Sequence, residues 1–489
     1  MKTHIKINSI KFNILLNMLY TLMNVAFPII TYPYVSRVLN PTGIGIVNFF
    51  TQIASYCTLV ASLGLSTYGI RAVAKTRNDR KKLSITVEEL LNINIVLTFF
   101  VILIYTILCI FIPQLKKYIA LAVINGITII TAPLSLDWLY SGLEQFSYIT
   151  KRDFLLKVIS AVLIFIFVKN KNDYVIYAFI LLLGNLGTTI FNFMYAHQFV
   201  DFTKNFKLKY RQHLKPMITL FASTLAVSVY LSLDTIMLGF INGEKQVGLY
   251  TTATKTETIL LAVVNAISVT LLPRLSAYIE QKDYQQYNQI LKKSISVIAI
   301  ITFSLCFFFI ITAQECVVIL GGRAYLGATL SMQLLMPILI ISGFSNITGN
   351  QVLIPQGKEI YFTRAVTAGA VVDILINLLV MKNYGAAGAS FATLIAEFTQ
   401  MSIQFYYSKD DILPNFDIQS VLKSACSVLL ASLIVIIVKK YVQILPLLIS
   451  MVVQAIVFFG TYLVFLFMFR EKNTKELVLF AFFKIKSKF

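Results

Sequence analysis

Long apolar runs recur along the whole chain and are separated by short polar segments. Most runs reach the length of about 20 residues that a helix needs to cross the hydrocarbon core of a bilayer. The pattern predicts membrane-spanning helices at 12–34, 43–66, 86–112, 117–141, 153–168, 173–197, 216–241, 247–273, 292–312, 327–353, 361–381, 385–407, 418–438 and 442–469. We therefore expect an all-α polytopic membrane protein with about 14 transmembrane helices.

Composition and charge agree with this expectation. Hydrophobic residues make up 57% of the chain and charged residues 13%, which is about half the charged fraction of a soluble domain. With a cytoplasmic N-terminus, about 31 of the 42 Lys and Arg residues fall in cytoplasmic segments. The positive-inside rule then favours an even number of spans with both termini in the cytoplasm. Membrane topology accounts for the net charge of +20, so nucleic acid is not an expected partner.

Short motifs recur about one half-chain apart. Asn40–Val47 is echoed by Asn242–Tyr250, and Tyr148–Lys151 by Tyr361–Arg364. Since an offset of six spans preserves orientation, we interpret the echo as a parallel repeat. The predicted organisation is two six-helix lobes around a central cavity, followed by a helix pair with a basic cytoplasmic tail. These parts cover residues 1–200, 201–408 and 409–489.

One helical hairpin carries two charges deep in apolar sequence. Asp234 precedes the turn at Asn242–Lys245, and Lys255 follows it. At a rise of 1.5 Å per residue, both lie roughly 10–12 Å from the same helix end, so the two charges could meet. An ionisable residue inside a membrane costs about 2.5–3.5 kcal/mol and usually faces a protein interior or a water-filled cavity. A purely structural ion pair is the alternative interpretation.

Polar residues also form stripes at helical spacing in four spans. The stripes are Asn13, Asn17, Tyr20 and Asn24; Asn48, Gln52, Ser55, Ser62 and Ser66; Thr251, Lys255, Thr258 and Asn265; and Ser390, Thr393, Glu397, Gln400 and Gln404. Spacings of three, four and seven place each set on one helix face. We prefer a hydrated cavity between the lobes as their explanation. Hydrogen bonding between neighbouring helices is the alternative.

Further charged residues are candidates for substrate binding, ion coupling or gating in such a cavity. Arg is suited to phosphate because its planar fork donates two parallel hydrogen bonds, and Arg37, Arg323 and Arg364 lie near helix ends. We expect Arg71, Arg152 and Arg274 at the cytoplasmic interface. For these three, a role in setting the membrane topology or in binding lipid headgroups fits at least as well as a role in the cavity. Asp137, Asp373 and Glu397 are candidates for ion coupling or gating. The scattered cysteines and histidines form no metal-ligand pattern, so neither a metal nor a cofactor is expected.

Five segments together resemble a known family. They are PYVSRVLNPTGIG (33–45), LGLSTYGIRAVA (63–74), DWLYSGLEQ (137–145), VGLYTTATK (247–255) and GAAGASFATLIAE (385–397). They resemble the Wzx-type polysaccharide flippases of the multidrug/oligosaccharidyl-lipid/polysaccharide exporter superfamily. The resemblance runs from Ile10 to about Tyr407. Lys255 and Arg37 match the family's lysine and arginine in the VGLYxxAxK and SRVL motifs, whereas Asn40 stands where many members have glycine.

The resemblance implies a twelve-helix, two-lobed core with two additional C-terminal helices. It implies alternating access that moves an undecaprenyl-diphosphate-linked oligosaccharide across the bacterial plasma membrane, without catalysis. Expected partners are the lipid-linked oligosaccharide, membrane lipid, and a polysaccharide polymerase and glycosyltransferases of the same pathway. The substrate-binding residues we expect are Lys255, Arg37, Asp234, Asn48, Gln52, Thr251, Arg323 and Arg364.

Other functions fit parts of the pattern. A cation-coupled exporter of drugs or small molecules, or a peptidoglycan-precursor flippase, could use the same fold. A membrane polysaccharide polymerase or ligase belongs to a different class. We rank it lower because the predicted outer connections are short and contain no histidine.

Overall fold

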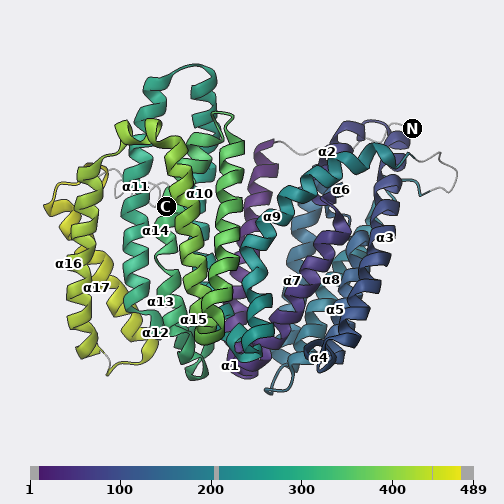
Figure 1. The fold of residues 1–489 in the computed structure, drawn as a ribbon, viewed down its shortest axis with the longest axis horizontal. Helices are drawn as coiled ribbons and strands as arrows, with labels where there is room; N and C mark the ends of the chain where they lie inside the picture. Colours follow the sequence, from purple (N-terminus) through teal and green to yellow (C-terminus); the bar gives the residue numbers. More distant parts are fainter. Residues whose placement is uncertain (1–9, 203–208, 443, 475–489) are drawn as a thin grey trace. The chain divides into compact units, whose positions relative to one another are not determined.

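The computed structural model describes residues 10–202, 209–442 and 444–474. Within these ranges the regular structure is entirely helical. The chain divides into two compact units, Met1–Gly248 (unit 1) and Leu249–Phe489 (unit 2), and each consists of long helices that run alongside one another (Figure 1).

Unit 1 contains the helices up to α9. They are α1 (Ile10–Ser62), α2 (Leu65–Thr76), α3 (Arg80–Phe111), α4 (Pro113–Lys116), α5 (Ile119–Thr131), the 3₁₀-helix η1 (Ala132–Ser135), α6 (Asp137–Gly142), α7 (Phe146–Phe167), α8 (Tyr174–Ala196) and α9 (Arg211–Asn242). Helix α10 (Glu244–Glu280) begins in unit 1 and continues into unit 2.

Unit 2 contains the remaining helices. They are α11 (Tyr284–Ile311), α12 (Ala313–Gly321), the 3₁₀-helix η2 (Arg323–Ala328), α13 (Thr329–Leu335), α14 (Ile338–Asn346), the π-helix η3 (Ile347–Leu353), α15 (Glu359–Asn415), α16 (Ile418–Val442) and α17 (Leu447–Met468). The C-terminal pair α16 and α17 packs together and against α11.

Two helical stretches are too long for a single crossing. Helix α1 has 53 residues and α15 has 57, or about 80 Å at 1.5 Å per residue, against a hydrocarbon core of about 30 Å. Each is broken once, α1 at Asn40 (φ 59°) and α15 at Gly385 (φ 53°). Each stretch therefore corresponds to two of the predicted spans.

The membrane class predicted from the sequence is confirmed. Among the described residues, ten helices are long and apolar enough to cross a membrane, and α1 and α15 each supply one of these ten. Helices α7 and α9 coincide with two further predicted spans, although neither is among the ten. Counting α1 and α15 twice and adding α7 and α9 recovers the predicted set of about 14 spans.

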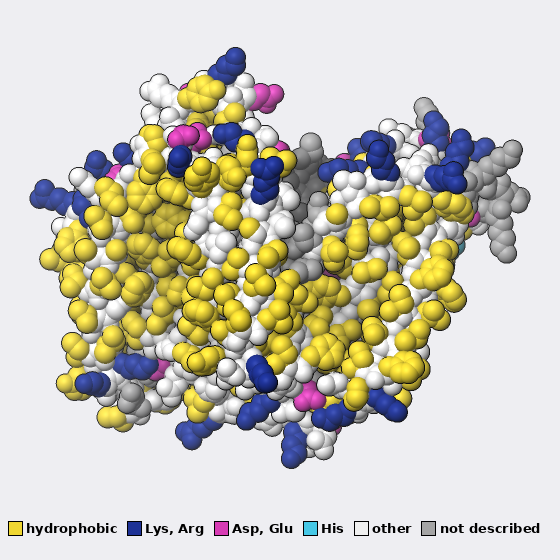
Figure 2. All heavy atoms as spheres, in the orientation of Figure 1, with side chains coloured by type: hydrophobic (Ala, Val, Ile, Leu, Met, Phe, Trp, Pro, Cys, Tyr) yellow, Lys and Arg dark blue, Asp and Glu magenta, His cyan; other side chains and the backbone are white. Residues whose placement is uncertain are grey.

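The surface of each unit suits a bilayer. Hydrophobic side chains cover the middle of the helices on the face in Figure 2, and Lys and Arg gather towards the helix ends. In α3, for example, Phe99, Phe100, Leu103 and Phe111 are all exposed. Exposed apolar side chains at this density would be a liability in water, but they match the lipid side of a transmembrane helix.

A pair of glycines brings two turns of unit 1 into close contact. A Cβ atom at Gly45 would lie 2.7 Å from the carbonyl carbon of Glu244, and one at Gly248 would lie 2.6 Å from that of Pro41. The break at Asn40 (φ 59°, ψ 174°) and the end of α9 at Gly243 (φ 81°, ψ 177°) also share one conformation. These positions are the ones that the predicted repeat pairs.

Candidate functional site

Three adjoining cavities open inside unit 1. Their volumes are about 540, 580 and 320 Å³, and we call them cavities 1, 2 and 3. Cavities 1 and 2 share Thr58, Ser62 and Thr128, cavities 1 and 3 share Asp137 and Thr188, and Asn185 lines all three. Each volume falls in the range of about 300–1,000 Å³ that small-molecule sites occupy.

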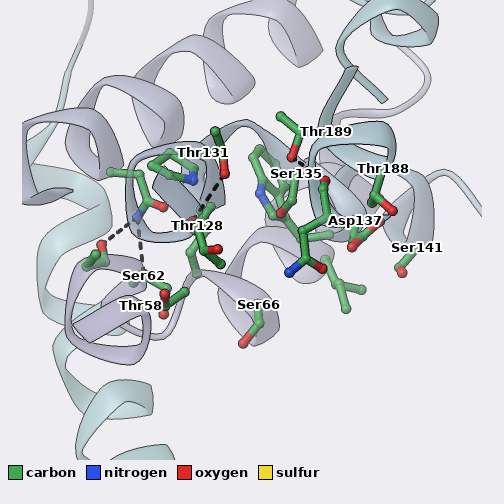
Figure 3. Close-up of a pocket in the computed structure, with 18 residues that line it drawn as sticks. Thr58, Ser62, Ser66, Thr128, Thr131, Ser135, Asp137, Ser141, Thr188 and Thr189 are labelled. Atoms are coloured by element: carbon green, nitrogen blue, oxygen red, sulfur yellow. Dashed lines mark hydrogen bonds between the residues drawn. The ribbon is translucent and has the colours of Figure 1, made fainter. Parts of the chain in front are cut away.

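Hydroxyl groups dominate the polar wall of cavity 1. Figure 3 shows ten labelled polar residues around it, brought together from six helical elements. Helix α1 supplies Thr58 and Ser62, α2 supplies Ser66, α5 supplies Thr128 and Thr131, η1 supplies Ser135, α6 supplies Asp137 and Ser141, and α8 supplies Thr188 and Thr189. These polar side chains lie on otherwise apolar helices, so the helices can enclose a hydrated cavity.

An irregular segment positions the carboxylate of this wall. The 3₁₀-helix η1 carries Pro133, and Leu136 follows with a left-handed φ of 53°. Proline cannot continue the hydrogen-bond ladder of a helix, so the chain turns here and restarts as α6. Asp137 is the first residue of α6, and its half-exposed side chain lines both cavity 1 and cavity 3.

Behind this carboxylate lies a buried arginine. Arg152 of α7 is 6% exposed. Its Nη1 lies 3.0 Å from Oδ1 of Asp137, and its Nη2 lies 2.6 Å from Oδ1 of Asp153. Asn192 of α8 accepts from Arg152 and donates to Asp137 at 3.0 Å. A guanidinium paired on two sides can remain buried, because the carboxylates and the amide replace its lost water.

A second basic side chain lines cavity 3. Lys157 is one turn and a residue beyond Arg152 on α7, and its Nζ donates to Oδ1 of Asn24. The Lys157 ammonium also lies 5.7 Å from the ring centroid of Tyr20. Cavity 3 therefore holds two cations and the two carboxylates Asp137 and Asp153, so its formal charges balance.

Cavities 1 and 2 differ from cavity 3 in charge. Within the described part of unit 1, their linings include no Lys, Arg or His, and Asp137 is their single charged residue. The described residues also contain no cluster of three His, Cys, Asp or Glu side chains that could hold a metal ion. The arrangement suits reversible binding of a polar, hydroxyl-bearing ligand.

The predicted site residues of unit 1 occupy different environments. Arg37 is exposed on α1, three residues before the break at Asn40, and Asp234 is buried on α9. Asn48 donates to the carbonyl of Ile44 at 2.9 Å, and Gln52 is half-buried one turn further along α1. Of the candidates in this unit, Asp137 lines the cavities described here.

The predicted site residues of unit 2 also vary in exposure. Lys255 is half-buried on α10 and forms no salt bridge within the described part of unit 2, while Thr251 on the same helix is buried. Two arginines are exposed, Arg323 at the start of η2 and Arg364 on α15 over the ring of Tyr361. The two acidic candidates on α15 are Asp373, which is buried, and Glu397, which is half-buried. The expected meeting of Lys255 with Asp234 involves both units and stays a prediction.

The polar stripes serve two purposes. Ser55, Ser62 and Ser66 of the second predicted span line cavities 1 and 2. In contrast, Gln404 accepts hydrogen bonds from Ser345 and Thr348 at 2.8 and 2.9 Å. These bonds, like that from Asn346 to Asn265, connect neighbouring helices of unit 2. The side chains of Asn13 and Asn17 lie outside the described residues.

Sequence reasoning missed part of the buried ionic network. The position of Arg152 at the cytoplasmic interface stays a prediction, but its burial between Asp137 and Asp153 was not foreseen. The adjacent Asp153 was the sequence signal for this burial, because its carboxylate can neutralise the neighbouring guanidinium at the start of an apolar helix. Asn192 and Asn185 were also missed, and each is an amide inside the apolar helix α8.

Comparison with protein families decides the classification. The family model described as "Polysaccharide biosynthesis protein" matches residues 10–279, which is more than half of the chain. The chain belongs to this family. A second family model, "Lipid II flippase MurJ", matches residues 154–467. Both matches confirm the resemblance to the Wzx-type flippases of the multidrug/oligosaccharidyl-lipid/polysaccharide exporter superfamily.

Individual relatives support the same placement. The chain is 23% identical over 393 residues to a "Putative O-antigen transporter" of Escherichia coli (strain K12), covering 80% of this chain and 94% of the relative. It is 27% identical over 399 residues to a protein of the same name from Shigella dysenteriae, covering 79% and 97%. A solved structure described as "Lipid II flippase MurJ, inward closed conformation" superposes with a TM-score of 0.74 at 13% identity, covering 94% and 99%. This superposition identifies the fold.

Proposed function

We propose that the chain is a flippase that moves a lipid-linked oligosaccharide from the inner to the outer leaflet of the bacterial plasma membrane for surface polysaccharide synthesis. Its termini lie in the cytoplasm. Transport proceeds by alternating access and makes or breaks no covalent bond. The observation that carries the proposal is a polar cavity enclosed by apolar spans in a member of the polysaccharide biosynthesis protein family.

The physical task explains why such a cavity is useful. Each polar group that enters hydrocarbon without a hydrogen-bond partner costs about 2–7 kcal/mol. An oligosaccharide diphosphate therefore crosses a bilayer very slowly without a transporter. A wall of hydroxyl, amide and charged groups replaces the water that the sugars lose. The polyprenyl tail remains in lipid, where its transfer costs nothing.

Charged residues outside cavities 1, 2 and 3 would bind the diphosphate. Lys255 and Arg37 attract it, with Arg323 and Arg364 as further cationic contacts near helix ends, and Asp234 orients Lys255. Polar contacts come from Asn48, Gln52 and Thr251. Asp137, Asp373 and Glu397 are the candidates for ion coupling or gating. A polysaccharide polymerase and glycosyltransferases would act after and before this step.

The role of Lys255 is testable in a cell that depends on the protein for its surface polysaccharide. Lys255→Ala and Lys255→Glu should reduce surface polymer severely and cause the lipid-linked intermediate to accumulate in the inner leaflet. Lys440→Ala is the matched control, because Lys440 is exposed in the last turn of α16. Normal surface polymer in both Lys255 variants would remove this residue from the mechanism.

A peptidoglycan-precursor flippase is the second candidate. The match of residues 154–467 to the "Lipid II flippase MurJ" family model favours it. The lipid intermediate that accumulates on depletion of the protein separates the two candidates. Oligosaccharide repeat units on the carrier support the first, and a peptide-bearing disaccharide supports the second.

A further inference from the structure

We infer that cavities 1 and 2 of unit 1 bind the sugar part of the substrate, not its diphosphate, and that they favour neutral or amino sugars over acidic ones. This inference rests on the proposed function and names the substrate class for one part of the path. It follows from which hydrogen-bonding groups the cavity walls have left to offer.

Half of the Ser and Thr hydroxyl protons in the walls of cavities 1 and 2 are already used. Six hydroxyls that line the two cavities donate to backbone carbonyls three or four residues earlier in their own helices, at 2.8 to 3.3 Å: those of Thr51, Ser55, Ser62, Thr128, Thr131 and Thr189. A hydroxyl has one proton and two lone pairs. After this internal bond it can offer the cavity only its lone pairs, so these six groups act as acceptors.

The buried amides of the walls behave in the same way. Asn94 donates its amide hydrogens to the carbonyls of Ala61 at 3.0 Å and Ser62 at 3.3 Å. Asn125 donates to the carbonyl of Leu121 at 3.0 Å. In both residues the amide oxygen remains as an acceptor, and Asn125 also keeps one N–H as a donor. The carboxylate of Asp137 adds one further acceptor oxygen, Oδ2, because its Oδ1 already accepts from Arg152 and Asn192.

An acceptor-rich wall selects for ligands that donate. Sugar hydroxyls, acetamido N–H groups and ammonium groups can each satisfy such a wall. A carboxylate or a diphosphate oxygen has no proton to give, so it satisfies none of these acceptors and regains only part of its lost hydration from the hydroxyl and amide donors that remain. The single charged residue of these two linings is Asp137, which is paired with Arg152, so the described linings offer no cation to attract an anion. Asn185 and Thr188 on α8, whose polar groups line the shared region, remain available as adaptable contacts.

A single tryptophan provides the reporter. Trp138 is the only Trp of the 489 residues, and it lines cavity 1. The purified full-length protein in nanodiscs would be titrated with polyprenyl diphosphate that carries N-acetylglucosamine, with the same carrier bearing glucuronic acid, and with polyprenyl diphosphate alone. Trp138 fluorescence should respond to the first probe, respond to the second only at roughly tenfold or higher concentration, and not respond to the third.

Two variants test the cavity contacts. Asn185→Leu and Thr188→Val should each weaken the response to the N-acetylglucosamine probe by roughly tenfold. Thr106→Val is the control for Thr188→Val, because it makes the same side-chain change at an exposed position of α3 outside the cavities. The comparison of the three probes on the unaltered protein decides the inference even where a variant fails to fold.

The outcomes separate this inference from the proposed function. An equal response to the sugar-free carrier would place the diphosphate in these cavities. Equal binding of the glucuronate probe would remove the selectivity. Either result overturns the inference, and so does the absence of a response to the N-acetylglucosamine probe. Transport of the same probes is measured separately in proteoliposomes. Transport without a selective Trp138 response contradicts the inference alone, whereas the absence of transport for every probe contradicts the proposed function.

Discussion

Gly248 at the start of α10 lies directly against the backbone of Pro41 in α1, so close that a Cβ atom would sit 2.6 Å from the Pro41 carbonyl carbon. Gly45 meets Glu244 in the reciprocal way. Because the neighbours are backbone atoms, they cannot move aside as a flexible side chain would. We expect Gly45→Ala and Gly248→Ala to separate the two turns, lower the thermal unfolding temperature and reduce surface polymer in cells.

Gly460→Ala is the matched control for these two variants. Gly460 lies within α17, and nothing lies within 4 Å of a Cβ atom built there. The added methyl group should be neutral or slightly stabilising, because alanine is the better helix former by about 1 kcal/mol. Equal unfolding temperatures for all three variants would show that the glycine contact is unimportant.

Asn40 adopts a left-handed backbone conformation, with φ 59°. Glycine has no steric penalty there, and a β-branched residue has the largest. Asn40→Gly should therefore keep or slightly raise stability, whereas Asn40→Val should lower it by about 1–2 kcal/mol. Thermal unfolding of the detergent-purified variants measures the difference, and a Val variant as stable as the Gly variant would exclude backbone strain as the cause.

The buried pair of Arg152 and Asp153, to which Asp137 adds a second carboxylate, should be sensitive to loss of the guanidinium. Arg152→Ala leaves two carboxylates without their counter-charge, and removing one partner of a buried pair typically costs about 3–5 kcal/mol. Arg152→Lys should lie between this variant and the unaltered protein, because lysine keeps the charge but loses the planar fork. Thermal unfolding would rank the three proteins.

Arg77→Ala serves as the comparison for the buried pair. Arg77 binds Glu144 at 2.6 Å, but 27% and 33% of the two side chains remain exposed. Exposed pairs contribute about 0–1 kcal/mol, so this variant should unfold close to the unaltered protein. If Arg152→Ala were no worse than Arg77→Ala, the network around Arg152 would not be stabilising.

Glu471, beyond the end of α17, should make stability depend on pH. Burial would raise the pKa of Glu471, but hydrogen bonds from Ser420 and Thr474 outweigh it and hold the pKa below its usual value. A depressed pKa means that the carboxylate stabilises the fold above the pKa of the unfolded chain and ceases to do so as pH falls through the folded pKa. Glu471→Gln should therefore be less stable at pH 7, with the difference shrinking below about pH 4.5. A difference that does not change with pH would contradict this.

The helices could be predicted because hydropathy acts on whole segments. A run of about 20 apolar residues has few alternatives to a transmembrane helix, so the spans and the membrane class followed from the sequence. The interruptions were harder to foresee. The turn at Asn40 was placed correctly, but the π-helix Ile347–Leu353 has no local signal that distinguishes it from ordinary helix.

The polar site was only partly predictable. Ser62 and Gln404 belong to stripes with the same helical spacing, yet Ser62 lines a cavity and Gln404 binds Ser345 across a helix interface. Spacing defines a helix face, but it does not define what lies opposite that face. Arg152 shows the same limit, since its burial depends on Asp137 and Asn192, which come from two other helices.

The most direct test of the central claim measures movement of substrate between leaflets. The purified chain would be reconstituted into liposomes that contain polyprenyl diphosphate N-acetylglucosamine, and a membrane-impermeant sugar-modifying reagent would report the fraction of sugar in the outer leaflet over time. We predict that the protein raises the rate of leaflet exchange above that of protein-free liposomes, and that Lys255→Glu abolishes the increase. Exchange at the protein-free rate, with correctly folded protein in the membrane, would contradict the proposal that this chain is a flippase.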